Sequence, residues 1–532
     1  DYLPEDIRKR YKLCTLPFAI RNIHDPADYE SVARAKKRLV FDEFFTFALG
    51  MALSGKKGRE SGAPACAQTD LTPLLSSFPY ELTGDQQKAI YDIQRDMAKE
   101  TPMSRILVGD VGCGKTVCAM AAMFIAASNG YQAVLMAPTE ILARQHYSDI
   151  APIFEKMGYR TELLVGSMTA GEKKRVRASL CEENEQKRVK IVIGTHALIS
   201  EGVEFHSCGV IVTDEQHRFG VAQRAALSKK GEKAHVLVMS ATPIPRSLAL
   251  IMYGNLDLSK INEMPRGRQR VDTFSVDESY RPRLNAFIEK QVAEGGQVYI
   301  VCPSVEEKEP EDSGEITLEA FGSDVEEMPP LKAAVQFAEE LSEALPSLDI
   351  AFLHGRMKGA DKDSIMKRFS EGDIDVLVST TVIEVGVNVP RATLMIVENA
   401  ERFGLAQLHQ LRGRVGRGSR KSYCVLVSDA KGENARERLK TMTREYDGFK
   451  IAEKDLLLRG PGDFIKGSSD PAVRQSGGLR FRLADMSEDA GVLSDAYEAA
   501  KELTDLSPDL SDKPELKAMI DRMFSIDTHS LN

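Results

Sequence analysis

The sequence predicts an α/β protein with two tandem parallel-sheet domains, a helical segment before them and a helical region after them. Short apolar runs alternate with helical patterns from about residue 83 to about 275, and a second alternating block runs to about 430. Strands that alternate with helices in this way are typical of parallel sheets. Beyond about 430 the strand signals stop, and the chain is charged and helical in pattern.

The elements of the two blocks follow from apolar runs and periodicity. In the first block we predict strands Arg105–Val108, Ala133–Ala137, Lys190–Ile193, Val210–Val212 and His235–Met239, and helices Lys115–Ala127 and Glu140–Lys156. In the second block we predict strands Gln297–Val301, Asp349–Leu353, Asp375–Val378, Leu394–Val397 and Ser422–Val427. Ahead of both, apolar residues at helical spacing over 31–53 predict a helix.

Chain length and the connectors set the predicted domain limits. At about 100–200 residues per domain, the 532 residues correspond to three or four units. A Gly-, Ser- and Ala-rich stretch at 54–70 and a Pro-, Gly- and Arg-rich stretch at 264–268 are predicted connectors. We therefore predict a helical segment and linker over 1–70, sheet domains over 71–270 and 271–430, and a helical region over 431–532.

The charge distribution leaves nucleic acid open as a partner. The formal net charge is −9, but residues 306–327 hold ten acidic side chains and one lysine, which accounts for −9 on its own. The remaining chain is neutral on average and can still present a basic groove. We interpret the acidic stretch as a solvated insertion loop.

The distribution of cysteines and of apolar residues bears on the kind of site and the cellular location that the protein can have. Eight cysteines are scattered singly without a C-x-x-C pair, which favours reduced thiols over a disulfide framework or a zinc site. No apolar run approaches the ~20 residues that a membrane span needs, so no membrane partner is expected. These features favour the cytoplasm.

The sharpest motif is the stretch from Gly109 to Thr116, which matches G-x-x-x-x-G-K-[ST], follows a predicted strand and opens a predicted helix. Glycines Gly109, Gly112 and Gly114 let backbone N–H groups curl round phosphates, and the helix N-terminus adds a positive dipole end. Lys115 is predicted to neutralise the phosphates, and the Thr116 hydroxyl to bind Mg²⁺. The motif predicts a nucleoside triphosphate site.

Two adjacent carboxylates, Asp214 and Glu215, end another predicted strand of the same sheet. We predict that Asp214 holds the magnesium ion, directly or through water, and that Glu215 activates the attacking water as a general base. Ser240 and Thr242 end the next strand and are predicted to relay the state of the carboxylate loop.

In the second block, the segment Gln410–Arg417 carries arginines spaced by glycines. Such a segment suits insertion into a phosphate site from across a cleft, where an arginine stabilises charge on the transferring phosphoryl group. We predict this catalytic role for Arg414 and Arg417, and nucleotide binding for Gln410.

Taken together, these motifs resemble the core of superfamily 2 helicases over roughly residues 80–430. The resemblance implies two RecA-like domains with ATP in the cleft between them. It implies that Gln86 binds the base, and that the nucleic-acid contacts come from Thr139, Arg144, Gly194, Thr195, His196 and Thr380.

The chain resembles the RecG family of DNA helicases more closely. The segments that carry this resemblance are Asp214–Val221, Asp455–Phe464, Arg474–Gly477, Leu3–Ile7 and Ala35–Glu43. The resemblance implies a double-stranded DNA translocase that remodels forks and Holliday junctions, with Gln216, His217, Arg459 and Gln475 coupling ATP turnover to movement. It further implies a fragment without the family's N-terminal wedge domain.

Other functions stay open on the sequence alone. A transcription-repair coupling factor shares the region around Arg459, and a nucleotide-gated DNA-binding module without strand separation fits a chain without a wedge. An RNA helicase is a weaker alternative, since RNA helicases do not carry a region like the one around Arg459. For the leading interpretation the expected partners are duplex or branched DNA, contacted mainly through phosphates, and a single-strand binding protein. The expected protein is a monomer associated with the bacterial nucleoid.

Overall fold

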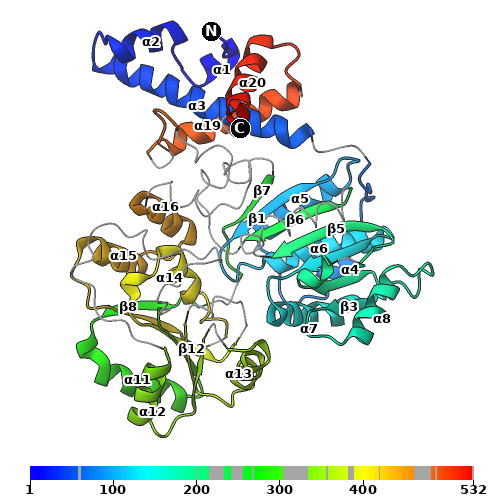
Figure 1. Cartoon of the computed structure of the whole chain (residues 1–532), viewed down its shortest axis with the longest axis vertical. Helices are drawn as coiled ribbons and strands as arrows, with labels where there is room; N and C mark the ends of the chain where they lie inside the picture. The colour runs from blue at the N-terminus through cyan, green and yellow to red at the C-terminus, as the bar shows by residue number, and fades with distance from the viewer. Residues whose placement is uncertain are drawn as a thin grey trace.

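The computed structural model describes residues 1–57, 62–200, 202–214, 233–240, 256–265, 269–303, 334–354, 357–380, 389–418, 420–459, 481–485, 488–507 and 509–529. They form two parallel sheets with flanking helices and one helical bundle, which lies above the two sheets in Figure 1. The predicted fold class is confirmed.

The first sheet has seven strands in the order β3-β4-β2-β5-β6-β1-β7, and every neighbouring pair is parallel. The strands are β1 Ser104–Gly109, β2 Gln132–Met136, β3 Thr161–Leu164, β4 Ile191–Gly194, β5 Cys208–Asp214, β6 His235–Ser240 and β7 Asp257–Ile261. The helices of this part are α4 Thr72–Leu75, α5 Gly84–Met97, α6 Lys115–Ser128, α7 Glu140–Lys156, α8 Ala170–Leu180 and the short η1 His196–Leu198.

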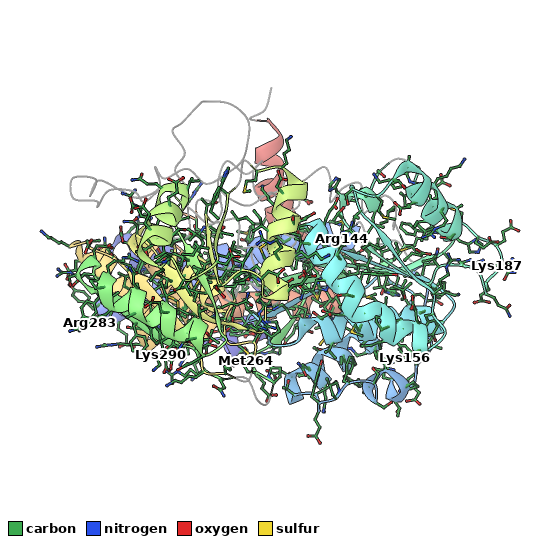
Figure 2. The ribbon with its side chains drawn as sticks, turned by 90° about the horizontal axis from the view of Figure 1, so that it is seen from below. Arg144, Lys156, Lys187, Met264, Arg283 and Lys290 are labelled. Atoms are coloured by element: carbon green, nitrogen blue, oxygen red, sulfur yellow. The ribbon has the colours of Figure 1, made fainter. Side chains whose placement is uncertain are left out.

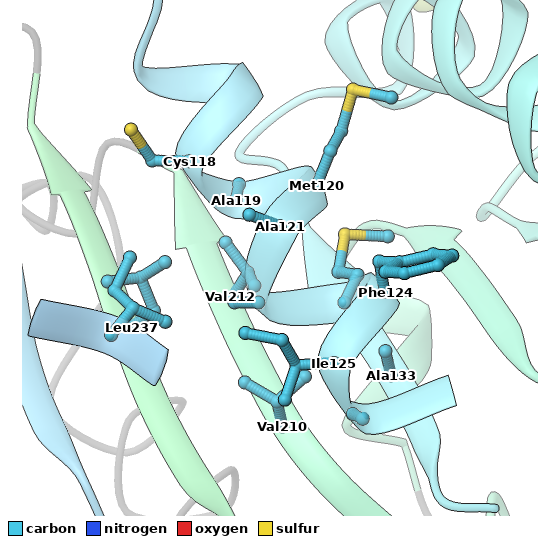
Figure 3. Close-up of a cluster of buried hydrophobic side chains, with 14 of the residues drawn as sticks. Cys118, Ala119, Met120, Ala121, Phe124, Ile125, Ala133, Val210, Val212 and Leu237 are labelled. Carbon is cyan, nitrogen blue, oxygen red and sulfur yellow. The ribbon is translucent and has the colours of Figure 1, made fainter. Parts of the chain in front are cut away.

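Alternating residues along the strands face two different cores, as the pleat requires. Val210 and Val212 of β5 pack under α6, whereas Ile211 between them joins the core under α8 on the other face. Figure 3 shows α6 packed beside the strands that carry Val210, Val212 and Leu237. Ala119 and Ala121 are fully buried, and the other residues from Val117 to Ala127 are buried as well, so the helix that follows the loop is enclosed in the core.

The second sheet has six parallel strands in the order β10-β11-β9-β12-β13-β8. They are β8 Asp272–Val276, β9 Gln297–Val301, β10 Ile350–Leu353, β11 Val376–Ser379, β12 Ala392–Val397 and β13 Tyr423–Val427. One face packs against α11 Arg281–Ala293 and α12 Ala334–Ala344. The other packs against α13 Gly359–Glu371, α14 Leu405–Arg412, α15 Glu433–Arg444 and α16 Gly448–Arg459. Short helices η3 Glu278–Tyr280 and η7 Ala400–Arg402 complete this part.

The helical bundle joins the two ends of the described chain. Its helices are α1 Glu5–Arg10, α2 Leu16–His24, α3 Tyr29–Lys57, α19 Ala490–Leu506 and α20 Pro514–His529. Phe44 and Phe45 of α3 share one apolar core with Leu493 of α19 and Leu516 of α20. Segments at opposite ends of the sequence therefore share one core (Figure 1).

A buried ion-pair network centred on Arg38 also holds the bundle together. Arg38 is fully buried, and its guanidinium bonds both carboxylate oxygens of Asp42, the carboxylate of Asp1 and the Cys14 carbonyl oxygen. Burial raises the pKa of Asp42 despite the arginine beside it. We expect Arg38→Ala to lower the free energy of unfolding of the bundle by about 3–5 kcal/mol, because a buried carboxylate loses its partner.

Urea unfolding followed by circular dichroism measures this change. Lys36→Ala, on an exposed position of the same helix, is the control and should leave the unfolding transition unchanged. Equal stability of the Arg38 and Lys36 variants would show that the network contributes nothing.

Candidate nucleotide site

The loop between β1 and α6 forms a glycine-rich turn at the carboxyl end of strand β1. Strand β1 ends at Gly109 and α6 begins at Lys115. Gly112 and Gly114 have φ angles of 79° and 85°, in the left-handed region that favours glycine. A loop of this conformation turns successive backbone N–H groups toward a bound anion.

Lys115 lies inside this loop. Its side chain is 9% exposed, and its Nζ donates to the carbonyl oxygens of Gly109 at 2.6 Å and Asp110 at 2.9 Å. Thr116 follows in the first turn of α6 and is half-buried. The cation and the N-terminus of α6 therefore both lie at this loop. That Lys115 neutralises a bound phosphate stays a prediction.

Gln86 braces the loop from α5. Its Oε1 accepts from the Thr83 N–H at 2.9 Å in a capping box, and its Nε2 donates to the Cys113 carbonyl oxygen at 2.8 Å. The side chain is 1% exposed. That Gln86 binds the base stays a prediction; the structure gives it a second task, which is to hold the loop at Cys113.

We expect Gln86→Ala to weaken nucleotide binding. The change removes the donor that the buried Cys113 carbonyl oxygen has in Gln86, which costs about 1–3 kcal/mol. If the loop moves to give this oxygen another partner, we expect nucleotide affinity to fall by roughly 5- to 150-fold. Titration with a fluorescent ATP analogue measures it, with the exposed neighbour Gln87 changed to Ala as control. Equal affinity in both variants would remove Gln86 from the site.

Asp214 ends β5, two strands from β1, and its carboxylate is held by a residue that the sequence did not single out. His146 Nε2 lies 3.0 Å from Asp214 Oδ2. The helical spacing of the sequence could have indicated His146, because it lies three residues after Ala143 and four before Ile150, on the buried face of α7. Glu215, Gln216 and His217 lie outside the described residues.

Helix α14 of the second sheet brings its C-terminal end to the loop. His409 Nε2 lies 2.6 Å from Asp110 Oδ1, and a Cβ on Gly413 would lie 2.9 Å from Val111 Cβ. Burial is the largest single effect on Asp110 and raises its pKa, but the hydrogen bonds from His409 and the Val111 N–H together with nearby positive charge outweigh it, so this pKa lies below its usual value. The loop over residues 109–116, called the nucleotide loop below, is thus a point of contact between the two sheet domains.

The two arginines with a predicted catalytic role, Arg414 and Arg417, come shortly after Gly413 in the sequence. Arg414 is 8% exposed, and Arg417 Nε donates to the Gly413 carbonyl oxygen at 3.3 Å. Burial raises the pKa of the Tyr299 hydroxyl on β9, and the positive charges of Arg414 and Arg417 oppose part of this rise, so both cations lie near this ring. Gln410 is buried in α14. Catalytic contact of these arginines with a phosphate stays a prediction.

The predicted nucleic-acid residues lie at strand ends and on α7. Thr139 caps α7, and Arg144 is exposed one turn later with its guanidinium 3.0 Å from Ser167 Oγ. Figure 2 shows Arg144 and Lys156 toward opposite ends of this helix.

The remaining strand-end residues differ in exposure. Gly194 abuts the Leu164 carbonyl oxygen, where a side chain has no room. Thr195 is buried, His196 is exposed, and Thr380 is half-buried. Within this group the structure gives a solvent-facing side chain to His196 and a half-exposed one to Thr380. Contact of any of these residues with a nucleic acid stays a prediction.

The predicted coupling residues are only partly described. Ser240 is buried at the end of β6, beside both β5 and β1. Arg459 ends α16, though the placement of its side chain is outside the described part, as are Thr242 and Gln475.

Thr116 and Asp214 are the residues that could hold a metal ion. A hydroxyl and a carboxylate are hard oxygen donors, which suit Mg²⁺. In the described part of the chain no group of three or more His, Cys, Asp or Glu side chains is arranged for a metal ion. Mg²⁺ that binds mainly through substrate phosphates and one or two protein oxygens needs no such group. Among the described residues, no helix combines the length and apolarity of a membrane span.

Three family models match consecutive parts of the chain. "DEAD/DEAH box helicase" matches residues 83–251, "Helicase conserved C-terminal domain" matches 282–419, and "ATP-dependent DNA helicase RecG, domain 3, C-terminal" matches 445–532. The first covers β1 to β6 of the first sheet, the second covers β9 to β12 of the second sheet, and the third covers α16, α19 and α20.

Curated relatives cover nearly the whole chain. An ATP-dependent DNA helicase RecG of Synechocystis sp. is 45% identical over 522 residues, which are 97% of this chain and 59% of that protein. One of Bacillus subtilis is 41% identical over 507 residues, 94% of this chain and 70% of that protein. A solved structure of RecG bound to a three-way DNA junction matches with a TM-score of 0.67 and 39% identity over 92% of this chain and 61% of that chain. The chain thus spans about three fifths to 70% of the relatives' length.

Proposed function

Because the chain belongs to the RecG family of ATP-dependent DNA helicases, we propose that it hydrolyses ATP and uses the energy to move along double-stranded DNA and remodel branched DNA. One observation carries this proposal beyond family membership. The loop that would hold the triphosphate is clamped between the two sheet domains through the Asp110–His409 contact. A ligand in this loop therefore acts on the relative position of the domains.

The proposed division of labour follows the chemistry of the side chains. Backbone N–H groups of the loop and Lys115 neutralise the phosphates, and Gln86 keeps the loop in shape. Glu215 removes a proton from the attacking water. Arg414 and Arg417 stabilise negative charge that develops on the transferred phosphoryl group. Bound Mg²⁺, held by Thr116 and Asp214, would neutralise further phosphate charge.

DNA is the partner that the family supports. The related RecG in the solved complex is bound to a three-way junction, and for this chain we propose the same class of ligand, contacted mainly through phosphates by Arg144, His196, Thr139 and Thr380. Gln216, His217, Ser240, Thr242, Arg459 and Gln475 are proposed to couple hydrolysis to movement. We also propose action as a monomer in the bacterial cytoplasm near the nucleoid, with a single-strand binding protein as a further partner.

The curated relatives do not favour a transcription-repair coupling factor. Strand displacement from a labelled three-way junction, with ATP and without it, tests the remodelling activity. We expect ATP-dependent displacement that Lys115→Ala abolishes. Hydrolysis without displacement would instead favour a nucleotide-gated DNA-binding module.

A further inference from the structure

One side chain of helix α7 is directed at the carboxylate to which the proposed function gives the metal ion. His146 Nε2 lies 3.0 Å from Asp214 Oδ2, although the two residues are 68 positions apart in the sequence. An ionised carboxylate only accepts hydrogen bonds, so the ring must carry a hydrogen on Nε2 and donate it. The imidazole therefore holds one of the two oxygens of Asp214 and limits the rotation of the carboxylate.

Little water competes for this contact. The side chain of His146 is 12% exposed and that of Asp214 is 15% exposed. A hydrogen bond that is shielded from water is electrostatically stronger than one in the solvent, because the local dielectric constant is low. The contact therefore orients the carboxylate more firmly than a histidine on the open surface could.

Both partners belong to elements that are packed into the core. Ala143, one turn before His146, and Ile150, one turn after it, are fully buried, so α7 cannot rotate about its axis without losing this packing. Asp214 ends β5, which lies between β2 and β6 in the first sheet. Helix α7 begins shortly after the end of β2, the neighbour of β5. The fold thus sets the position of His146 relative to Asp214.

The orientation of this carboxylate matters for the metal ion that it is proposed to hold. Mg²⁺ demands near-ideal octahedral geometry and binds through few protein oxygens, so it tolerates little misorientation of each of them. Thr116, the other proposed oxygen donor, lies in the first turn of α6, whereas Asp214 is the last residue of a strand. Side chains that hydrogen-bond a metal-binding group commonly set the affinity for the metal. His146 is placed to do this for Asp214.

We propose that His146 is a positioning residue for Mg²⁺ binding, which holds Oδ2 and so turns the Asp214 carboxylate toward the metal ion. This inference rests on the proposed function, in which Asp214 holds Mg²⁺ beside the nucleotide. The strength of that site then depends on a histidine of another element. The role does not require His146 to touch the nucleotide.

Binding of a fluorescent ADP tests this role without hydrolysis. The affinity of the protein for the fluorescent ADP is measured over a series of Mg²⁺ concentrations, and the concentration that gives half of the full Mg²⁺ effect is compared between variants. We expect His146→Ala to raise this concentration about 10- to 100-fold, the loss typical when a side chain that supports a metal-binding group is removed. The affinity for the nucleotide without Mg²⁺ should stay as in the unmodified protein.

Two further variants separate positioning from folding. His146→Gln keeps an N–H donor on a side chain of similar reach and should recover most of the Mg²⁺ response. His206→Ala, at an exposed position of the same sheet domain, is the control for the loss of a histidine and should behave as the unmodified protein. A Gln variant that responds to Mg²⁺ as weakly as the Ala variant would overturn the hydrogen bond as the cause.

A double-mutant cycle with Asp214→Asn shows whether His146 acts through Asp214. If it does, His146→Ala adds little to the loss already caused by Asp214→Asn, so the two effects are not additive. Additive effects would overturn the proposal, as would a Mg²⁺ response in His146→Ala that is unchanged or stronger. A Mg²⁺ response that Asp214→Asn alone leaves intact would instead overturn the metal role of Asp214 in the proposed function, and the role of His146 with it.

Discussion

Changing Lys115 to Ala is expected to lower ATP hydrolysis by on the order of 10²–10³-fold, the loss typical when one preorganised group is removed from a transition-state site. The buried Nζ is held in the loop by the carbonyl oxygens of Gly109 and Asp110, so its position is set before a ligand arrives. A water molecule that fills the space left by the lysine side chain carries no positive charge, so it cannot replace Lys115 beside a phosphate.

Steady-state release of inorganic phosphate measures this loss. Lys156→Ala is the matched control, since Lys156 is exposed at the far end of α7 (Figure 2) and should behave as the unmodified protein. A Lys115 variant that keeps full activity, with an unchanged melting temperature, would contradict the assignment of the loop as the ATP site.

Changing Gly114 to Ala is expected to reduce hydrolysis by about 10²-fold through loop geometry alone. Its φ of 85° costs an L-residue about 1–2 kcal/mol. The added Cβ would also collide with Gln86 Nε2, an atom fixed by its bond to the Cys113 carbonyl oxygen. The loop must shift to relieve this contact, and a displacement of about 1 Å at a reacting centre can cost 10²-fold in rate.

Gly158 supplies an unusually well matched control. It also has a φ of 85°, but a Cβ there meets nothing within 4 Å. Gly158→Ala should therefore lose stability through backbone strain, by about 1–2 kcal/mol, and keep its activity. Thermal unfolding and phosphate release on both variants separate the two effects. Equal loss of activity in both would mean that strain, and not the contact with Gln86, is responsible.

Sequence periodicity located central strands better than edge strands. The predicted Gln297–Val301 and Glu140–Lys156 coincide with β9 and α7. The strands that were not predicted, β3, β7 and β8, all lie at sheet edges. Edge strands are exposed on one side, so they carry polar residues: β7 reads Asp-Leu-Ser-Lys-Ile, which lacks a continuous apolar run.

The nucleotide loop could be predicted because its chemistry is local in the sequence. Eight consecutive residues, Gly109–Thr116, supply the glycines, the cation and the hydroxyl. His146 and His409 could not be assigned in this way, because each acts on a carboxylate far along the chain. The shared core of α3 and α19 was missed for the same reason: periodicity shows that a helix has an apolar face but not which partner covers it.

The measurement that tests the central claim most directly is steady-state ATP hydrolysis at low salt. The additions are buffer alone, single-stranded DNA, duplex DNA, a model fork and RNA, with Glu215→Gln as the blank. Phosphate-based binding weakens as salt rises, so low salt favours detection. We predict stimulation by duplex or fork DNA that the blank lacks. Stimulation by RNA alone, or by none of these additions, would contradict a DNA-driven ATPase.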